Sequence, residues 1–521
     1  MSRTVSTGDI GMDVILGGGW RLVERIPGRE SATVVLRGGP GTGKTLLAAD
    51  VALALARALS GDVVVACVEL LPSEYVAQLE SGRSELMLQW RDGPKLSQTK
   101  IVILPQETRA SSSESPRIFC GLLPELSGAV PDLVAALESL QREVVSLDGK
   151  PAVFVVDSLI AGYHLGPSLP RQNVDAVMKF AAQEGVGLVL CEEATGEVAS
   201  SWDFAADTVL ELEHHRTDDR QIVVRKHRFG PSATGVHQLE IRGWRQPRVA
   251  PRPDAWLDGR KLYPTLSQYG WKFLNGHGYP PLTWIDDLLP SSGAADYAAA
   301  LAVVSVPHLE LARKLAFGLV PVGSPSQVDV VIDLDPISAR LEGWSSRNIS
   351  VCTLPVALGA KVAICEIVEY LGQKLFVDTD SERPRRILIG DLATVVGTRD
   401  VALWVESICV IAMLVAESGW GIPLIVYDSS SATASKNDID SLRARADLTV
   451  DAVFSENSIA VGHVDSRLDG VSEVLHWPTE RLCGPWPEEI ARMARLHGPD
   501  RGRSFIGPRK ARRRNRVPKE E

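Results

Sequence analysis

The chain has 521 residues, of which 45% are apolar and 23% charged, an ordinary composition for a globular protein of two or three domains. It has no run of about 18 apolar residues, and its first residues, MSRTVSTGDIGMD, contain no apolar core. Neither a membrane span nor a signal peptide is therefore expected. The net charge of −10 is uneven: residues 500–521 carry nine Lys and Arg against three acids, or +6, which leaves −16 on the rest.

The seven cysteines are scattered, form no CxxC pair and lie mostly in apolar runs. This pattern is typical of small buried side chains in a reducing compartment, and it argues against a zinc site or a disulfide framework. A cytoplasmic location is therefore expected. The cysteines are Cys67, Cys120, Cys191, Cys352, Cys365, Cys409 and Cys483.

The first half alternates short apolar, β-branched runs with segments of strong helix formers. Strands are expected at 32–36, 62–68, 100–105, 152–157 and 186–191, with closing strands at 207–213, 220–227 and 236–241. Helices are expected at 46–59, 73–80, 132–147 and 173–184, and surface loops at 82–98 and 106–130. This alternation predicts an α/β domain over residues 1–247, with a mostly parallel sheet flanked by helices.

A linker is expected at 248–276, because residues 243–275 contain four Pro and three Trp without a clear period. The strand–helix rhythm then restarts and predicts a second α/β domain over 277–497. Its strands are expected at 299–305, 328–335, 349–355, 386–391, 423–428 and 458–464, and its helices at 309–319, 360–371 and 400–418. Residues 498–521 are too polar to pack and are expected to form a disordered tail.

A phosphate-binding loop follows the first of these strands and opens a helix. Its sequence GGPGTGKT matches G-x-x-x-x-G-K-[ST] in the required context. Glycines allow consecutive backbone N–H groups to face one anion, and the helix N-terminus adds partial positive charge. The loop therefore predicts binding of a nucleoside triphosphate, ATP with Mg²⁺, rather than a turn without a ligand. It consists of Gly38, Gly39, Pro40, Gly41, Thr42, Gly43, Lys44 and Thr45.

Two acids at strand ends complete the expected site. Lys44 is expected to contact the β- and γ-phosphates, and Thr45 to bind Mg²⁺. Asp157 ends an apolar strand where a second Mg²⁺ ligand belongs, although a strand-ending Asp can also cap a turn. Glu69 ends another strand, where a carboxylate can activate the attacking water. The alternative for Glu69 is a solvated strand end.

With these motifs in order, residues 7–242 resemble the KaiC-like branch of the RecA superfamily. TGDIGMDVILGGGW at 7–20 is similar to the family's N-terminal motif, and VELLPSEY at 68–75 to the segment that carries two adjacent glutamates. FVVDSL at 154–159 resembles its Walker B strand, and residues 207–235 its closing strands with a Lys-x-Arg segment. The fold that this resemblance implies is RecA-like.

The resemblance assigns roles to single residues and implies a hexameric ring, a homo-oligomer. Glu69 falls on the first glutamate, the expected catalytic base, whereas the second is replaced by Leu70, which makes hydrolysis slower or less certain. Lys226 and Arg228 fall on the pair that reaches the γ-phosphate of the neighbouring subunit, so hydrolysis would depend on assembly. The alternative for these two cations is a solvated strand pair.

The second half is interpreted as a degenerate copy of the first. Residues 277–293 faintly resemble the N-terminal motif, but the following loop, VSVPHLELA, has neither Gly nor Lys beside a Ser or Thr. Asp391 falls where a Walker B Asp would, and Asp333 and Asp335 end a strand. These features predict a RecA-like core that has lost nucleotide binding, so no clock autokinase is expected. An unrelated α/β domain is the alternative.

The tail carries a dense cationic run, PRKARRRNR, at 508–516. Residues 501–519 could screen nucleic-acid phosphates or bind an acidic protein partner, although a solvated tail fits equally. The sequence thus supports three functions: a KaiC-like ATPase with slow turnover, an ATP-dependent assembly switch, or a nucleic-acid-dependent ATPase. The acidic body and the lack of interleaved aromatic residues rank the last of these lowest.

Overall fold

The protein was analysed as a computed structural model, in which the chain forms two compact units. The first comprises Met1–His277, Cys352–Glu382 and Thr398–Trp420; the second comprises Gly278–Val351, Arg383–Gly397 and Gly421–Glu521. The structure describes residues 2–68, 70–82, 100–102, 116–122, 133–159, 171–193, 201–214, 220–241, 247–256, 266, 268–269, 302–306, 330–333, 350–353, 359–376, 387–390, 401–417, 423–428, 440, 443–444, 448–455, 458–466 and 475–478.

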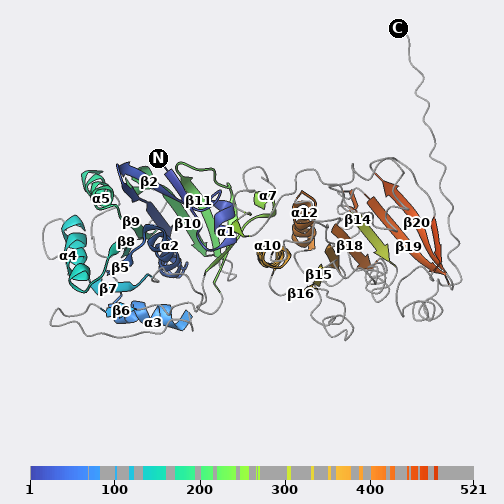
Figure 1. Ribbon diagram of the computed structural model, residues 1–521, viewed down its shortest axis with the longest axis horizontal. Helices are drawn as coiled ribbons and strands as arrows, with labels where there is room; N and C mark the ends of the chain where they lie inside the picture. Colours follow the sequence, from blue (N-terminus) through green and yellow to red (C-terminus); the bar gives the residue numbers. More distant parts are fainter. Residues whose placement is uncertain are drawn as a thin grey trace, which may run out of the picture. The chain divides into compact units, whose positions relative to one another are not determined.

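A mixed ten-stranded sheet forms the core of the first unit (Figure 1), in the order β13-β12-β11-β10-β4-β9-β8-β5-β7-β6. The run from β10 to β7 is parallel, and β6, β11, β12 and β13 are antiparallel additions. The strands are β4 (Thr33–Gly38), β5 (Asp62–Cys67), β6 (Lys100–Val102), β7 (Ile118–Leu122), β8 (Pro151–Asp157), β9 (Gly187–Glu193), β10 (Thr208–His214), β11 (Arg220–His227), β12 (Val236–Glu240) and β13 (Arg248–Ala250). The α/β class and the mostly parallel sheet expected from the sequence are confirmed.

Helices cover both faces of this sheet because its central strands are apolar on both sides. The helices α2 (Lys44–Leu59) and α3 (Pro72–Gly82) pack on one face, with Val34 and Leu36 of β4. On the other face, α4 (Leu133–Ser146), α5 (Arg171–Glu184) and α6 (Ser201–Ala205) pack with Val35. Side chains of β4 therefore alternate between two cores, which fixes the strand that leads into the phosphate loop.

The loop expected at 106–130 contains a strand, so that part of the expectation is wrong. The strand β7 pairs in parallel with β5, and its residues Phe119 and Cys120 are buried. Its run of five residues, IFCGL, is too short to outweigh the Ser-, Pro- and Gly-rich sequence around it. Parallel pairing in the sheet, which no local pattern contains, decides the conformation.

The N-terminal motif folds into a small sheet and a short helix. The strands β1 (Ser2–Val5), β2 (Trp20–Ile26) and β3 (Arg29–Ser31) are antiparallel, and α1 (Ile10–Ile15) lies between the first two in sequence. The carboxylate of Asp9 accepts hydrogen bonds from the N–H groups of Gly11 (2.8 Å) and Val249 (2.8 Å). Asp9 thereby joins α1 to β13, and burial raises its pKa to about 6.

Asp13 is the second anchor of this motif and is fully buried. Its carboxylate accepts from the hydroxyl of Ser6 (2.5 Å), the N–H of Thr7 (2.7 Å) and the hydroxyl of Tyr269 (2.7 Å). Gly19 packs beside it with φ of +121°, and a Cβ there would stand 2.1 Å from the carbonyl oxygen of Val5. Asp9 and Asp13 of the motif thus anchor the backbone, and Gly19 allows close packing.

The first part of the segment expected to be a linker belongs to the core of the first unit. In addition to β13, the helix α7 (Pro253–Trp256) lies there, and Val249, Trp256 and Leu266 are buried. Of the prolines and tryptophans that suggested a linker, the described ones are buried: Pro247, Pro251, Pro253 and Trp256. The rest of the segment, apart from residues 266, 268 and 269, lies outside the described residues.

His237 of β12 gives the first unit a pH-dependent stability. Its ring is fully buried and Nδ1 accepts from the N–H of Arg252 at 3.2 Å, and burial lowers its pKa from 6.5 to about 4. Because the unfolded chain then binds the proton more tightly, stability should fall as pH drops from about 6.5 towards 4. Between pH 7 and pH 5 we expect a loss of about 2 kcal/mol from this residue.

Urea unfolding of the parent and of His237→Gln at both pH values tests this expectation. The glutamine retains an acceptor for Arg252 but does not titrate. Asp9, whose raised pKa acts with the opposite sign, contributes equally to both proteins and cancels in the difference. Identical pH dependence of the two proteins would show that the imidazole of His237 is not kept neutral by the fold.

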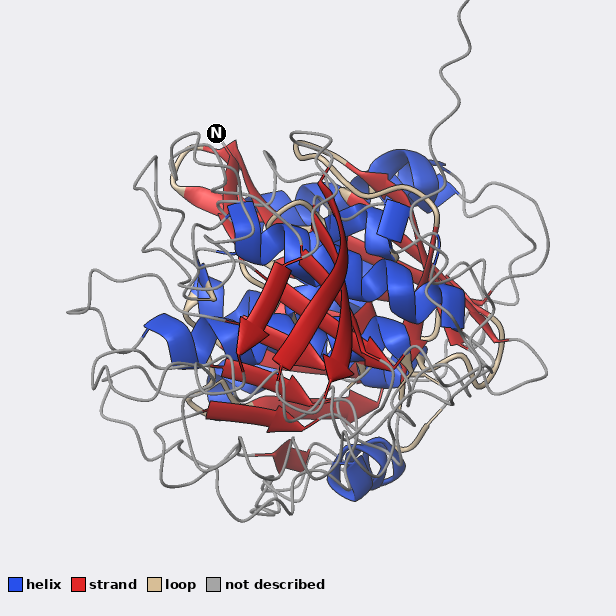
Figure 2. Cartoon of the chain, turned by 90° about the vertical axis from the view of Figure 1, so that its right-hand side faces the viewer, coloured by secondary structure: helices blue, strands red, loops and turns tan. Residues whose placement is uncertain are grey.

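The second sheet has eight strands and repeats the strand order of the first. The described strands of the chain are drawn in red in Figure 2. Its order is β16-β15-β17-β18-β14-β19-β20-β21, with β20 and β21 antiparallel at one end. The neighbours of β4 on its two sides are β10-β11-β12 and β9-β8-β5-β7, whereas those of β14 are β19-β20-β21 and β18-β17-β15-β16. The strands are β14 (Ala302–Val306), β15 (Val330–Asp333), β16 (Ser350–Thr353), β17 (Ile387–Gly390), β18 (Pro423–Asp428), β19 (Leu448–Ser455), β20 (Ser458–Ser466) and β21 (Leu475–Pro478).

Two helices from the second half of the sequence belong to the first unit. They are α10 (Ala360–Phe376) and α12 (Val401–Glu417), both expected from the sequence. The thiol of Cys365 donates to the carbonyl oxygen of Val249 at 3.6 Å, and Arg248 forms an ion pair with Glu366. These contacts join α10 to β13, so the first unit is not a continuous stretch of chain.

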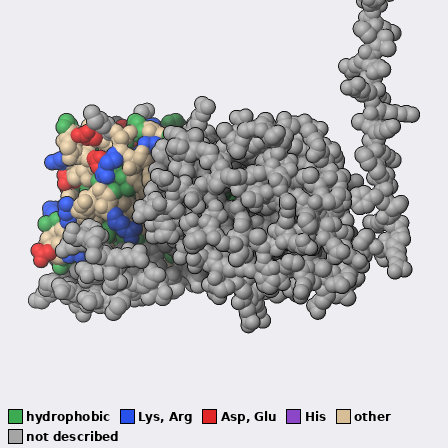
Figure 3. All heavy atoms as spheres, turned by 45° about the vertical axis from the view of Figure 1, so that its right-hand side comes forward, with side chains coloured by type: hydrophobic (Ala, Val, Ile, Leu, Met, Phe, Trp, Pro, Cys, Tyr) green, Lys and Arg blue, Asp and Glu red, His purple; other side chains and the backbone are tan. Residues whose placement is uncertain are grey.

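The described surface and interior agree with the general expectations for composition. No helix within the described ranges has the length and apolarity of a segment that crosses a bilayer. Five cysteines with described side chains are buried, as expected: Cys67, Cys120, Cys191, Cys365 and Cys409. Figure 3 shows basic (blue) and acidic (red) side chains interspersed on one face of the first unit. Asp335, Asp391, the helix expected at 309–319 and the basic run at 501–519 lie outside the described residues.

Candidate nucleotide-binding site

The loop Gly38–Thr45 leaves the carboxyl end of β4 and enters α2. Gly41 and Gly43 have φ of +74° and +98°, and Gly43 stands at the N-cap of the helix. A Cβ on Gly43 would lie 2.1 Å from Cδ1 of Ile241, whereas one on Gly39 or Gly41 would meet nothing within 4 Å. The loop is thus packed on the β12 side and open on its outer side, which leaves its backbone able to surround an anion.

Lys44 is only 8% exposed, and its ammonium group lies inside the loop. Its Nζ donates to the carbonyl oxygens of Gly38 at 2.7 Å and Gly39 at 2.9 Å. Its charge also acts on the carboxyl group of Asp157, whose pKa it lowers. Because its two hydrogen-bond acceptors are neutral carbonyls, the ammonium group could donate to charged phosphate oxygens in their place.

Asp157 lies at the carboxyl end of β8 and forms a side-chain hydrogen bond with Thr45. The two residues are 112 positions apart in the sequence, and their contact was expected from the motifs. Burial raises the pKa of Asp157, while the hydrogen bonds from Thr45 and Cys191 and the charge of Lys44 lower it. Within the described part of the chain, its Oδ2 atom is buried and has no hydrogen-bond partner.

These two side chains fit a magnesium ion. Mg²⁺ in nucleotide sites takes one or two protein oxygens, and phosphates and water supply the rest of its shell. An orphaned carboxylate oxygen beside a loop hydroxyl offers such a pair. Among the described residues no cluster of three or more His, Cys, Asp and Glu could hold a metal, so a site built wholly from such protein ligands is not found there.

The expected base, Glu69, lies outside the described residues, but the chain on either side of it is described. The N–H of Val68, the residue before Glu69, donates to the carbonyl oxygen of Asp157 at 2.9 Å. Val68 therefore lies beside Asp157. Leu70, at the position of the second family glutamate, is partly buried against the core under α2. Where the family has its second glutamate, this chain therefore has an apolar side chain that packs against the core.

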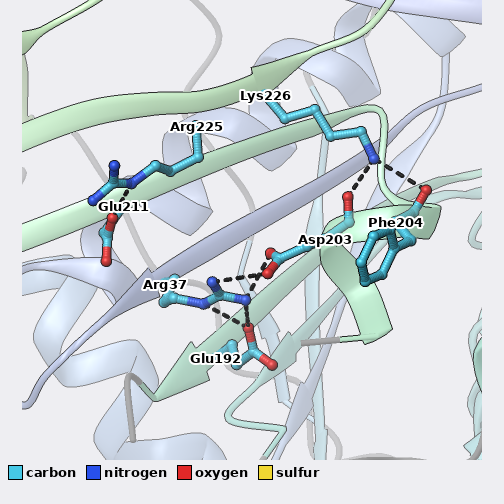
Figure 4. A network of polar contacts seen from close by, with 7 residues as sticks. All are labelled: Arg37, Glu192, Asp203, Phe204, Glu211, Arg225 and Lys226. Atoms are coloured by element: carbon cyan, nitrogen blue, oxygen red, sulfur yellow. Dashed lines mark hydrogen bonds and ion pairs between the residues drawn. The ribbon is translucent and has the colours of Figure 1, made fainter. Parts of the chain in front are cut away.

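Lys226 and Arg228 do not reach the loop of their own chain. Lys226 pairs with Val209 of β10, three residues before Leu212, which pairs with Gly38. That offset is about 10 Å along the strands, in the direction away from the loop. Lys226 Nζ instead donates to the carbonyl oxygens of Asp203 and Phe204 in α6 (Figure 4). Arg228 donates to the same carbonyl oxygen of Phe204.

A polar network around Arg37, absent from the sequence analysis, fixes the strand that enters the loop. Arg37 directly precedes Gly38 and forms ion pairs with Glu192 of β9 and Asp203 of α6, both at 2.7 Å (Figure 4). All three side chains are less than a quarter exposed. An Arg before the loop motif was the only local signal, because both partners are more than 150 residues away in the sequence.

Comparison of the sequence with protein-family models and with curated proteins finds no match.

Proposed function

We propose that the chain is a KaiC-like P-loop ATPase, which binds ATP with Mg²⁺ in Gly38–Thr45 and hydrolyses it slowly. The observation that carries this proposal is the hydrogen bond between Thr45 and Asp157, beside the buried Lys44 ammonium group. A Gly-rich turn without a ligand gives no reason for a hydroxyl, an orphaned carboxylate oxygen and a buried cation to meet at one strand edge.

Each residue then has a distinct role. The backbone N–H groups of the loop and the N-terminus of α2 hold the phosphates, and Lys44 exchanges its carbonyl partners for the β- and γ-phosphate oxygens. Thr45 and Asp157 would hold Mg²⁺, which neutralises charge that develops on the phosphates. Glu69 orients and deprotonates water from the neighbouring strand end.

Titration of the full chain with ATP, with and without Mg²⁺, tests the proposal when phosphate release is followed in parallel. We expect saturable binding that Mg²⁺ strengthens, and slow release of phosphate. Absence of nucleotide binding at millimolar ATP would exclude the function.

Lys226 and Arg228, at the end of β11 that lies away from the phosphate loop, favour a site that two subunits share. We propose that Lys226 and Arg228 of one subunit act on the γ-phosphate held by the next, in a ring. Their distance from their own loop supports this arrangement, and burial together with Arg228 lowers the pKa of Lys226, as for a partly desolvated cation. Hydrolysis would then require that the subunits assemble.

The variant that carries both Lys226→Ala and Arg228→Ala is expected to bind Mg·ATP normally but to release phosphate at least about 100-fold more slowly, because cations supplied in trans stabilise the transition state. Mixing it with a Lys44→Ala chain should restore turnover, since some interfaces then combine an intact loop with intact cations. A mixture as inactive as its components would contradict a shared site.

The second half is proposed to be a degenerate copy of the first core. The shared strand order supports duplication, and β14 occupies the position of β4. The sequence after β14, PHLELARK, has no glycine to surround a phosphate. One nucleotide site per chain is therefore expected.

A second candidate function is an assembly switch with negligible turnover, favoured by the replacement of the second glutamate by the packed Leu70. Native mass measurement with a non-hydrolysable ATP analogue separates the two functions when compared with phosphate release. Assembly that depends on the nucleotide without measurable turnover would favour the switch. Fast turnover in chains that do not assemble would exclude it.

A further inference from the structure

Tyr75 carries a buried hydroxyl group on which the charge of Asp157 acts. The residue lies on α3, six positions after Glu69, and is only 1% exposed. Its ring packs in the core that contains Cys67, Cys120 and Cys191. Within the described part of the chain, its Oη atom has no hydrogen-bond partner.

A buried hydroxyl without a partner destabilises a fold, and native proteins rarely retain one without a use. A phenylalanine would fill the same volume without this cost. Burial raises the pKa of Tyr75 well above its ordinary value, and the charge of Asp157 is the next cause. The hydroxyl is therefore a protonated donor at neutral pH, and it lies within the field of the carboxylate whose own Oδ2 atom is unpaired.

We propose that Tyr75 is a positioning residue of the magnesium site, whose hydroxyl and Asp157 Oδ2 together hold a water molecule of the Mg²⁺ hydration shell. The inference rests on the proposed function, because it needs Mg·ATP in the loop. Mg²⁺ gives up its water reluctantly and is usually bound with several waters in place. A water between a donor and an acceptor would satisfy both orphaned groups at once.

The position of Tyr75 in the chain gives this contact a second consequence. The N–H of Val68 is bonded to the carbonyl oxygen of Asp157, and the N–H of Tyr75 to that of Leu71 at 3.0 Å. The segment that carries Glu69 is thus attached to Asp157 at its start by the backbone. Through Tyr75 this segment would also be attached to the metal site at its end when Mg²⁺ is bound.

Tyr75→Phe removes one oxygen and tests the inference in the full chain. Without nucleotide, the variant should unfold at the same temperature as the parent or higher, since an unpaired buried hydroxyl is removed. With a non-hydrolysable ATP analogue, half-maximal binding should need about fivefold more Mg²⁺, the effect of one lost hydrogen bond. Affinity for the analogue without Mg²⁺ should be unchanged.

Tyr269→Phe is the matched control, because its hydroxyl already donates to Asp13 at 2.7 Å. It should lower the unfolding temperature with and without ligand and leave the Mg²⁺ requirement unaltered. If Tyr75→Phe behaves like this control, the hydroxyl has an ordinary structural partner and the inference is wrong. If the parent chain shows no Mg·ATP binding, the proposed function fails. If the parent binds Mg·ATP and Tyr75→Phe has the same Mg²⁺ requirement as the parent, only the inference about Tyr75 fails.

Discussion

Replacing Lys44 with alanine is expected to weaken Mg·ATP binding at least about 100-fold and to abolish phosphate release. Two charge-assisted hydrogen bonds to phosphate oxygens contribute roughly 1.5–3 kcal/mol each, and together they account for that factor. Among the described residues, the ammonium group donates to the carbonyl oxygens of Gly38 and Gly39, which charged phosphate oxygens should displace. Calorimetric titration of the variant measures the loss.

Lys150 offers a matched control for this substitution. It is an exposed lysine at the start of β8, and its Nζ also donates to a backbone carbonyl, that of Ser60, at 2.9 Å. Lys150→Ala removes an equal charge at the amino end of β8, at the end of the strands away from the loop. It should leave the affinity for Mg·ATP within a factor of two of the parent's. If Lys44→Ala retains the parent's affinity, the loop is a turn without a ligand, and the proposed function would have to be abandoned.

The local structure of the candidate site was predictable because each part depends on a few adjacent residues. The loop needs glycines at fixed positions, and α2 contains strong helix formers without a breaker. The contact between Thr45 and Asp157 was predictable as well, since carboxyl ends of parallel strands meet at one edge. The sequence was therefore sufficient to predict the conformation of the loop and the contact between Thr45 and Asp157.

Features that depend on distant pairing were not predictable. The sequence of β7 is short and enclosed by loop-forming residues, and only its pairing with β5 makes it a strand. The strand order around β4 depends on crossovers that local patterns do not encode. The packing of α10 against β13, through Cys365 and Val249, joins residues 116 positions apart.

Side chains that support the site were missed for a related reason. Arg37 is flanked by glycines and apolar residues, and its acidic partners come from β9 and α6. Tyr75 lies at a core position of an amphipathic helix, where an aromatic residue normally only packs. Its unpaired hydroxyl becomes informative only when its neighbours in space are known.

The N-terminal motif shows how a recognisable pattern can serve stability rather than chemistry. Asp13 has no exposed surface and receives three hydrogen bonds, from Ser6, Thr7 and Tyr269. These donors come from the turn after β1 and from a segment more than 250 residues later in the chain. The single carboxylate therefore joins two segments of the first unit that are far apart in sequence.

Asp13→Ala is expected to destabilise the first unit by about 3–5 kcal/mol, because it leaves one N–H and two hydroxyls, all partly buried, without their acceptor. Asp13→Asn should cost less, since the amide oxygen can still accept from Thr7 and the hydroxyls can rotate. Asp254→Ala, which removes an exposed carboxylate paired with Arg252 at 2.6 Å, should change stability by less than about 1 kcal/mol. Urea unfolding of the three variants measures the order; if Asp13→Ala unfolds at the same midpoint as Asp254→Ala, water satisfies these donors and the buried carboxylate does not close the fold.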